Sequence, residues 1–370
     1  MIKKIGYYIF SLFFHLYRLW PVNSNKIFLV ASHDQGPEGN IGLMKEWIEG
    51  KKENCKFVYL TREDGINHPL RFFGKLAFDL ATSSVIFLDN SFMPMAYTPF
   101  AKGVKVVQLW HGTGTIKKFG LDAEEEEVCQ VAKKGNQRIT HLIVNGPRTK
   151  DQYQTAFGLA EERIFQEGLP RTDLILDRDR MGQLEEKFYR EYPEYREKKI
   201  LLYAPTFRDS QVEDPRLALD LEKFVKKMNE DQVLFLRLHP HVADNFKEPV
   251  EELYGGRVVN MSAYPGVASL LQVADCLITD YSSIMFEFYL LKKPVFFFAY
   301  DLAEFEKEGR SFYEDYRQFV PGPVCLNQEE LVEAMEDYKW DEARWQAFCQ
   351  DNYKYLDTGA RDRVFSLIFK

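Results

Sequence analysis

The sequence predicts an α/β protein built from two doubly wound halves. Apolar stretches of strand length alternate with stretches of helical periodicity, which is typical of parallel sheets covered on both faces by helices. The alternation runs twice, on either side of a highly charged stretch at 177–199. At 370 residues the chain also suits two domains of ordinary size. We therefore expect a first domain at 23–180 and a second at 181–370, whose last helix can pack back on the first.

The first half contains five candidate strands, each a short apolar run. They lie at residues 27–31, 57–60, 85–88, 104–109 and 141–144. Helical stretches separate several of them, at 42–48, 69–81 and 148–157. This alternation predicts a Rossmann-like half with a parallel sheet.

The second half repeats the pattern. Its candidate strands lie at 200–203, 233–238, 258–260, 276–279 and 295–298. Neither half contains a G-x-G-x-x-G turn, which argues against a dinucleotide-dependent dehydrogenase. Open α/β sheets bind ligands at the carboxyl ends of their strands, so we expect the site in a central cleft between the halves.

Composition excludes several classes of protein. A formal net charge of −8 argues against a nucleic-acid binder, which usually needs a basic face. Five cysteines, an odd number without a C-x-x-C pair, indicate neither a zinc site nor a disulfide framework. We expect no metal site and no cofactor, and a reducing, cytoplasmic compartment.

Residues 1–22 are the only membrane-like segment. Lys3 and Lys4 precede an apolar, aromatic-rich stretch that ends at Trp20. The stretch is short for a bilayer span, and no small-residue cleavage site follows it. Basic and aromatic residues at both ends predict an amphipathic helix in the membrane interface. The alternatives are a helix that packs on the first domain and, less favoured, a signal peptide.

His111 stands out in the first half. It lies at 108–114, a glycine-containing stretch directly after an apolar strand. Glycine permits close backbone approach, and histidine suits proton transfer near neutral pH. A structural or solvated loop histidine is the alternative. The strand-end position favours a catalytic role, with Gly112 and Thr113 beside it.

Two further strand ends lie in the second half. At 203–209, Thr206 and Arg208 are suited to bind an oxyanion, although a strand-ending turn with a surface arginine is equally consistent. At 237–241, a metal site formed by His239 and His241 is disfavoured because alternate residues of an extended chain point oppositely. We expect His239 to donate a hydrogen bond to phosphate.

The stretch 274–288 predicts a strand, a tight turn and a helix. Ser282 and Ser283 fall at the helix N-terminus, where backbone N–H groups and the helix dipole favour a phosphate. Asp280 is expected to cap the helix, and the alternative is that the whole turn serves only as a cap. Arg310 is a candidate phosphate clamp, with a surface salt bridge as its alternative.

Five motifs occur in a characteristic order: WHGT, APTFRD, LHPH, ITDYSS, and FYEDY followed by PGP. In this order, over about 27–367, the chain resembles the CDP-glycerol glycerophosphotransferase family of wall teichoic acid and capsule synthesis. The resemblance implies a GT-B-like architecture. It also implies that the second half holds the CDP-linked donor and the first half a membrane-bound acceptor.

Motif by motif, the resemblance implies specific roles. His111 and His239 would be catalytic, His111 as the general base, with Gly112 and Thr113 on the acceptor side. The donor-binding residues would be Thr206, Arg208, His239, Asp280, Ser282, Ser283 and Arg310. No metal cage or cofactor is implied.

The implied reaction is attack by an acceptor hydroxyl on the β-phosphorus of CDP-glycerol, with release of CMP. The acceptor would be a lipid-linked glycan or teichoic acid precursor at the cytoplasmic face of the membrane. Three alternatives stay open: transfer from CDP-ribitol, glycosyl transfer from a nucleotide sugar, and a catalytically silent membrane-associated scaffold.

Overall fold

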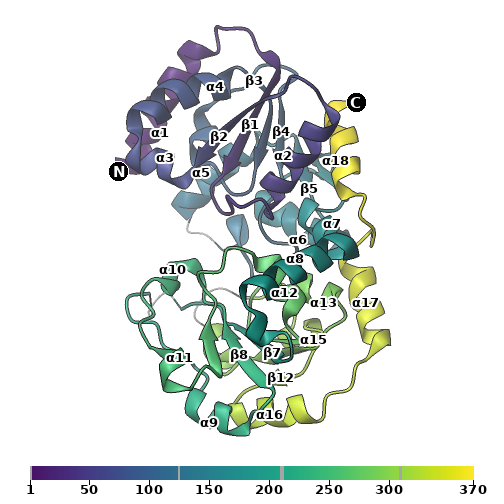
Figure 1. Cartoon of the computed structure of the whole chain (residues 1–370). Coiled ribbons are helices and arrows are strands. Elements are labelled where there is room, and N and C mark those ends of the chain that lie inside the picture. The colour runs from purple at the N-terminus through teal and green to yellow at the C-terminus, as the bar shows by residue number, and fades with distance from the viewer. Residues whose placement is uncertain (1, 124–125, 209–211, 308–310) are drawn as a thin grey trace. The chain divides into compact units, whose positions relative to one another are not determined.

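The computed structural model describes residues 2–123, 126–208, 212–307 and 311–370, which form two compact units (Figure 1). The first unit comprises Met1–Thr113, Lys118–Asp173 and Asp351–Lys370. The second comprises Gly114–Lys117 and Leu174–Gln350. Each unit contains a six-stranded sheet in which every described strand pairing is parallel. The predicted α/β class with two Rossmann-like halves is therefore confirmed.

The first sheet has the order β2-β1-β3-β4-β5-β6. Its strands are β1 Asn23–Ala31, β2 Lys56–Thr61, β3 Ser83–Leu88, β4 Lys105–Gln108, β5 His141–Ile143 and β6 Ile164–Phe165. The side chains of β1 alternate between the two faces. Phe28 and Val30 enter one hydrophobic cluster, while Ile27 and Leu29 enter the other. Both faces of the sheet are thus buried, as expected for a parallel sheet.

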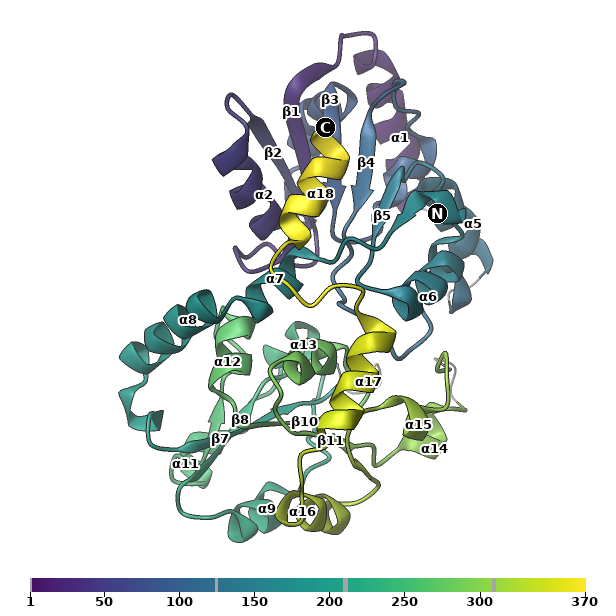
Figure 2. The same cartoon turned by 90° about the vertical axis from the view of Figure 1, so that its right-hand side faces the viewer.

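Helices cover both faces of this sheet (Figure 2). The helices of the first unit are α1 Ile2–Tyr17, α2 Asn40–Lys51, α3 Arg62–Asn67, α4 Ala77–Ala81, α5 Glu126–Asn136, α6 Pro147–Phe157 and α18 Ala360–Phe369, with α7 Pro170–Leu176 at the boundary between the units. A π-helix, η1 Arg71–Leu76, precedes α4, and short 3-10 turns lie at η2 Met93–Tyr97, η3 Gly120–Asp122 and η4 Glu161–Arg163. The C-terminal helix α18 lies beside α2 in this unit.

The second sheet has the order β12-β11-β10-β7-β8-β9. Its strands are β7 Lys199–Ala204, β8 Gln232–Leu236, β9 Val258–Asn260, β10 Cys276–Thr279, β11 Val295–Phe298 and β12 Val324–Cys325. Strands β8 and β9 follow on one side of β7, whereas β10, β11 and β12 follow on its other side. The carboxyl ends of β7 and β10 therefore form the topological switch point, where open sheets bind ligands.

Ten helices, together with the 3-10 turn η5 Pro193–Tyr195, surround this sheet in the described part of the chain. They are α8 Arg178–Glu191, α9 Leu221–Lys227, α10 Pro240–Ala243, α11 Val250–Leu253, α12 Val267–Val273, α13 Ile284–Leu290, α14 Leu302–Phe305, α15 Tyr316–Phe319, α16 Gln328–Glu336 and α17 Glu342–Asn352. The charged stretch expected to link the halves forms α8. This helix packs on α12, and its Met181 and Phe188 side chains are buried, so it is part of the second unit and not a free linker.

Asp173 ends the first unit and anchors the returning C-terminal segment. Its fully buried carboxylate accepts hydrogen bonds from the backbone N–H groups of Ala360 (2.8 Å) and Arg361 (2.9 Å). The Arg361 Nε atom adds an ion pair at 3.0 Å. These contacts explain why the unit boundary lies at 173 instead of the expected 180, and why residues 351–370 belong with the first unit.

The N-terminal helix α1 has two apolar faces. Phe10 and Phe14 are fully buried in the first unit, where Phe10 contacts the rings of Phe72 and Phe92. The opposite face is exposed, with Leu12 at 70% exposure. The helix is therefore a packed element of the domain. Among the described residues, no helix combines the length and apolarity needed to cross a bilayer.

Candidate active site

The first unit gathers three loops at the carboxyl ends of β1, β3 and β4, and Asp89 organises them. Its buried carboxylate accepts hydrogen bonds from the backbone N–H groups of Ser32 (2.9 Å), His33 (3.1 Å) and Asp34 (3.0 Å). Its backbone carbonyl accepts a hydrogen bond from Nδ1 of His111 at 2.9 Å. Burial raises the pKa of Asp89, and the three backbone donors oppose that rise.

The contact with Asp89 determines which ring nitrogen of His111 carries the proton. A carbonyl oxygen only accepts, so Nδ1 must donate, and in the neutral imidazole the lone pair then lies on Nε2. Two rings stack on this imidazole: His33, with centroids 3.8 Å apart and planes 18° apart, and Trp110, at 4.2 Å and 30°. Trp110 adopts a left-handed conformation, with φ of 56°. In this tautomer the Nε2 atom of His111 is the nitrogen that can accept a proton.

Gly112 and Thr113 form the frame of this loop. The hydroxyl of Tyr153 donates to the Gly112 carbonyl at 3.0 Å, and the Asn145 amide donates to the Thr113 carbonyl at 2.7 Å. Both loop residues are buried. They therefore hold His111 in place, whereas direct contact with an acceptor stays a prediction.

Gly114 is the first residue of the second unit and packs against α13. A Cβ atom at this position would lie 2.4 Å from Cε1 of Phe286, whose ring is buried. The glycine in this motif is therefore required by packing on Phe286.

We expect Gly114→Ala to lower the free energy of unfolding by about 1–3 kcal/mol, because a buried ring must move to admit the methyl group. Gly182→Ala is the matched control in the same unit: no atom lies within 4 Å of the added Cβ in α8, so that variant should be neutral or gain about 0.5–1 kcal/mol. Urea unfolding of the two variants checks the prediction. Equal stability of the two would contradict it.

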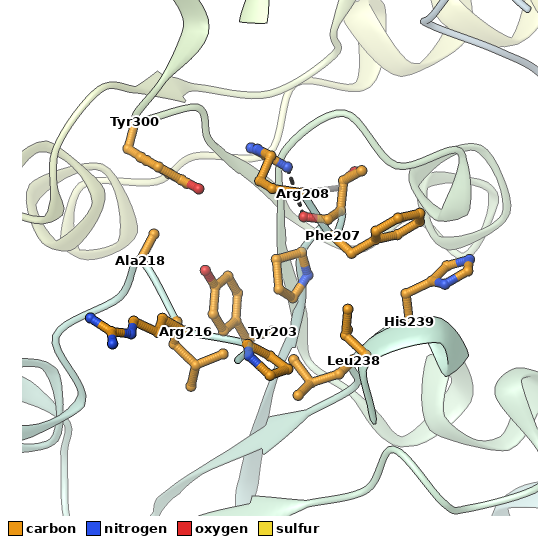
Figure 3. Close-up of a pocket in the computed structure, with 13 residues that line it drawn as sticks. Tyr203, Phe207, Arg208, Arg216, Ala218, Leu238, His239 and Tyr300 are labelled. Carbon is orange, nitrogen blue, oxygen red and sulfur yellow. Dashed lines mark hydrogen bonds between the residues drawn. The ribbon is translucent and has the colours of Figure 1, made fainter. Parts of the chain in front are cut away.

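The second unit contains a pocket at the carboxyl ends of β7 and β8 (Figure 3). It is an open hollow, and the space between its walls amounts to about 440 Å³ when the open solvent is included. The pocket brings together three predicted donor-binding residues, Thr206, Arg208 and His239. Its apolar lining includes Tyr203, Phe207, Leu217 and Tyr300. Asp280, Ser282 and Ser283 are not among its lining residues, and Arg310 lies outside the described residues.

Arg208 is held between two carboxylates. Its Nε and Nη2 atoms donate to Asp301 at 2.7 and 2.9 Å, and Nη2 also donates to Asp280 at 3.0 Å. Nη1 donates to the Thr206 carbonyl at 2.7 Å, the contact drawn in Figure 3. Burial opposes the charge, but the carboxylates dominate and raise the pKa of Arg208. The predicted phosphate ligand is thus also the centre of an ion-pair network.

Asp280 does not cap the following helix, so that part of the prediction is wrong. The N-cap of α13 is Ser283, and no side chain accepts a capping hydrogen bond there. The Asp280 carboxylate instead accepts from the backbone N–H groups of Thr206 (2.8 Å) and Tyr281 (2.6 Å). The reason is the switch point: β7 and β10 are adjacent, so Asp280 faces the end of β7.

Ser282 and Ser283 lie in the tight turn between β10 and α13, as the sequence predicts. Both are half-buried, and the Ser282 hydroxyl makes a long contact of 3.4 Å with the Ile284 N–H group. The aromatic motif downstream supports this turn: Tyr316 donates to the Asp280 carbonyl at 2.8 Å, and Phe312 packs on Tyr281.

The sequence pattern did not single out three residues that shape these strand-end loops: Asp301, Arg237 and His33. Asp301 accepts from Arg208 and from the hydroxyl of Tyr281 (2.9 Å). Arg237 donates through Nη1 to the carbonyls of Met261 (2.9 Å), Ser262 (2.8 Å) and Tyr264 (2.5 Å), which fixes the loop after β9. His33 was missed as well, although it follows β1 at the same sheet edge as His111.

The described side chains form no evident site for a metal ion. In the described ranges, no cluster of three or more His, Cys, Asp or Glu residues is arranged to hold a metal ion. The Thr206 hydroxyl oxygen is buried without a hydrogen-bond partner among these residues, at the edge of the pocket. A polar ligand group would satisfy it.

Comparisons with known proteins agree on one family. The model of the CDP-Glycerol:Poly(glycerophosphate) glycerophosphotransferase family matches residues 12–370. The chain is 30% identical to a teichoic acid poly(ribitol-phosphate) polymerase of Bacillus spizizenii, covering 99% of this chain but 60% of the polymerase. It is also 30% identical to a teichoic acid ribitol-phosphate primase of the same organism, over 95% of this chain and 92% of the primase.

A solved structure of the wall teichoic acid polymerase TagF shares the fold. It has a TM-score of 0.82 at 24% identity, and the match covers 99% of this chain and 95% of that chain. A UDP-GlcNAc 2-epimerase from Neisseria meningitidis matches more distantly, with a TM-score of 0.58 at 11% identity, over 93% and 99% of the two chains. Both matches support a GT-B-like fold.

Proposed function

Because the chain belongs to the CDP-glycerol:poly(glycerophosphate) glycerophosphotransferase family, we propose that it transfers glycerol phosphate from CDP-glycerol to a hydroxyl group of a membrane-linked teichoic acid or envelope glycan precursor, releasing CMP. The resemblance predicted from the motifs is thus confirmed at the level of the family. The activity itself is a proposal, since the chain spans 60% of the first polymerase that it matches.

The observation that carries the proposal is the state of His111. Its Nδ1 atom donates to the Asp89 carbonyl, which leaves the Nε2 lone pair to accept a proton. His111 takes the proton of the acceptor hydroxyl, and the oxygen attacks the β-phosphorus of the donor. The bond from that phosphorus to the bridging oxygen breaks, and CMP leaves with the electron pair. Chemistry of this kind depends mainly on positioning and charge stabilisation.

The donor is held by the second unit in this proposal. The pocket beside Thr206, Arg208 and His239 combines apolar walls with polar groups, as nucleotide sites usually do. His239 packs on the ring of Phe207, with centroids 4.7 Å apart, and in this proposal it donates to a phosphate oxygen. Asp280, Ser282 and Ser283 lie at the neighbouring strand end and complete the proposed donor site. Arg310 remains a proposed clamp on the basis of sequence alone.

CDP-ribitol is a second candidate donor, and a specific observation favours it. The two relatives at 30% identity over nearly the whole chain are named as a ribitol-phosphate polymerase and a ribitol-phosphate primase. A teichoic acid glycerol-phosphate transferase of Staphylococcus aureus is 31% identical, over 71% of each chain. The two donors share the CDP group, so only contacts to the polyol distinguish them.

Nucleotide release tests the proposal. Purified protein is incubated with membrane extract as acceptor and with CDP-glycerol, CDP-ribitol or UDP-sugars in separate reactions. We expect CMP from CDP-glycerol. CMP from CDP-ribitol alone would reassign the polyol. A nucleoside diphosphate released from a UDP-sugar would mean glycosyl transfer, and no release from any donor would favour a scaffold.

The acceptor is proposed to be reached at the cytoplasmic face of the membrane through the outer face of α1. Its exposed apolar residues recur at helical spacing, on the side opposite buried Phe10 and Phe14. They are Ile5, Tyr8, Ile9, Leu12 and Leu16, followed by Leu19 and Trp20 just beyond the helix. An exposed apolar face of this size is typical of a membrane or protein contact, and aromatic and basic flanking residues favour a lipid interface.

We expect the double variant Leu12→Glu with Leu16→Glu to sediment at least about 10-fold less with vesicles of phosphatidylglycerol and phosphatidylethanolamine, because each leucine contributes about 1.5–3 kcal/mol when buried. Leu253→Glu is the control, since it removes an exposed leucine from the second unit. Unchanged binding of the double variant would refute lipid contact through α1.

A further inference from the structure

His33 and His111 form a stacked pair that the proposed mechanism does not yet use. Their ring centroids are 3.8 Å apart and their planes 18° apart. Trp110 stacks on the same imidazole at 4.2 Å and 30°. Two rings this close to one centroid would overlap if they shared a face, so they must lie on opposite faces. The imidazole of His111 therefore lies between the rings of His33 and Trp110.

Asp89 holds both histidines of the pair in place. The carboxylate of Asp89 accepts from the backbone N–H group of His33, and its carbonyl accepts from Nδ1 of His111. One residue at the end of β3 therefore fixes both histidines. Core packing does not explain the position of His33 against His111, because His33 is exposed.

The two imidazole rings cannot easily both carry a positive charge. Like charges 3.8 Å apart repel each other, so the two rings take up their protons in separate steps. The surrounding charges favour His33 for the first proton. The Asp89 carboxylate attracts a charge on His33, whereas the Arg171 guanidinium donates to the His111 carbonyl at 3.3 Å and opposes a charge there. Asp34, whose N–H group is also held by Asp89, adds a further negative charge beside His33.

We infer that His33 is a positioning residue that covers one face of His111 and takes up the first proton bound by the pair, so that His111 stays able to accept the proton of the acceptor hydroxyl at lower pH. This inference deepens the proposed function and rests on it for its role in catalysis. The stacked pair itself is a property of the first unit and is testable without any substrate.

The test compares the wild type with His33→Phe, which keeps a ring on the face of His111 but cannot bind a proton. Histidine ring nitrogens are labelled with ¹⁵N, the His111 signal is assigned by its loss in His111→Gln, and protonation is followed by NMR from pH 5 to 8. We expect His111 in His33→Phe to bind its proton at a pH higher by about one unit. His68→Phe, at another exposed histidine of this unit, should leave His111 unchanged.

The pH dependence of kcat for CMP release is the second readout. Its acid limb should move to higher pH in His33→Phe, in the same direction as the NMR titration, and a loss of packing alone would not move it. An unchanged or lower protonation pH of His111 would overturn the inference. If the wild type releases no nucleotide from any donor, the proposed function fails, and the NMR titration still decides whether the pair shares protons as inferred.

Discussion

His111→Ala should lower the rate of CMP release by about 10²- to 10⁴-fold while donor binding stays close to that of the wild type. The reason is that His111 belongs to the first unit and accepts a proton there, whereas the proposed donor contacts lie in the second unit. General-base catalysis typically contributes this factor. The measurement is single-turnover CMP release together with the Kd of CDP-glycerol by calorimetry.

His111→Gln is the matched variant for that experiment. Its amide can still donate to the Asp89 carbonyl and fill the space between His33 and Trp110, but it cannot act as a base near neutral pH. We expect His111→Gln to be as slow as His111→Ala and more stable. A large loss of donor affinity in both variants, with little change in single-turnover rate, would instead place His111 in the donor site.

The strand pattern of both halves was predictable because parallel sheets are buried on both faces and their strands form continuous apolar runs. Ten of the twelve strands were expected within one or two residues of their ends, apart from the longer start of β1. The missed strands, β6 Ile164–Phe165 and β12 Val324–Cys325, have two residues each, too few to show a period. The predicted helix at 69–81 contains a π-helix, which requires backbone geometry to recognise.

The candidate site was predictable in part. The rule that strand ends carry ligand-binding groups located His111, Thr206, Arg208 and His239, and the same rule applied to β1 would have located His33. The network around Arg208 was not predictable, because Asp280 and Asp301 lie 72 and 93 residues away along the chain. That residues so far apart in the sequence lie close together becomes evident only from the sheet order, which places β7 beside β10.

Arg208→Ala should lower the free energy of unfolding of the second unit by about 3–5 kcal/mol, because it removes the cationic partner of the buried Asp280 and the half-buried Asp301. Asp280 is 2% exposed and the Arg208 side chain 14%, so solvent cannot replace the lost ion pairs well. Urea unfolding followed by tryptophan fluorescence measures this loss. Arg216→Ala is the control, since it removes an exposed arginine from the same pocket.

A double-mutant cycle with Asp301→Asn separates the two roles that Arg208 can have. If Arg208 mainly holds the ends of β7 and β10 together, Asp301→Asn should lower the free energy of unfolding much less in the Arg208→Ala background than in the wild type. In that background the charge on Asp301 has already lost its ion pair with Arg208 and is itself destabilising. If Arg208 mainly binds the donor phosphate, Arg208→Ala should weaken CDP-glycerol binding with little loss of stability. The ion-pair network favours the first outcome, in which Arg208 positions the pocket around the donor and loss of donor affinity follows from loss of structure.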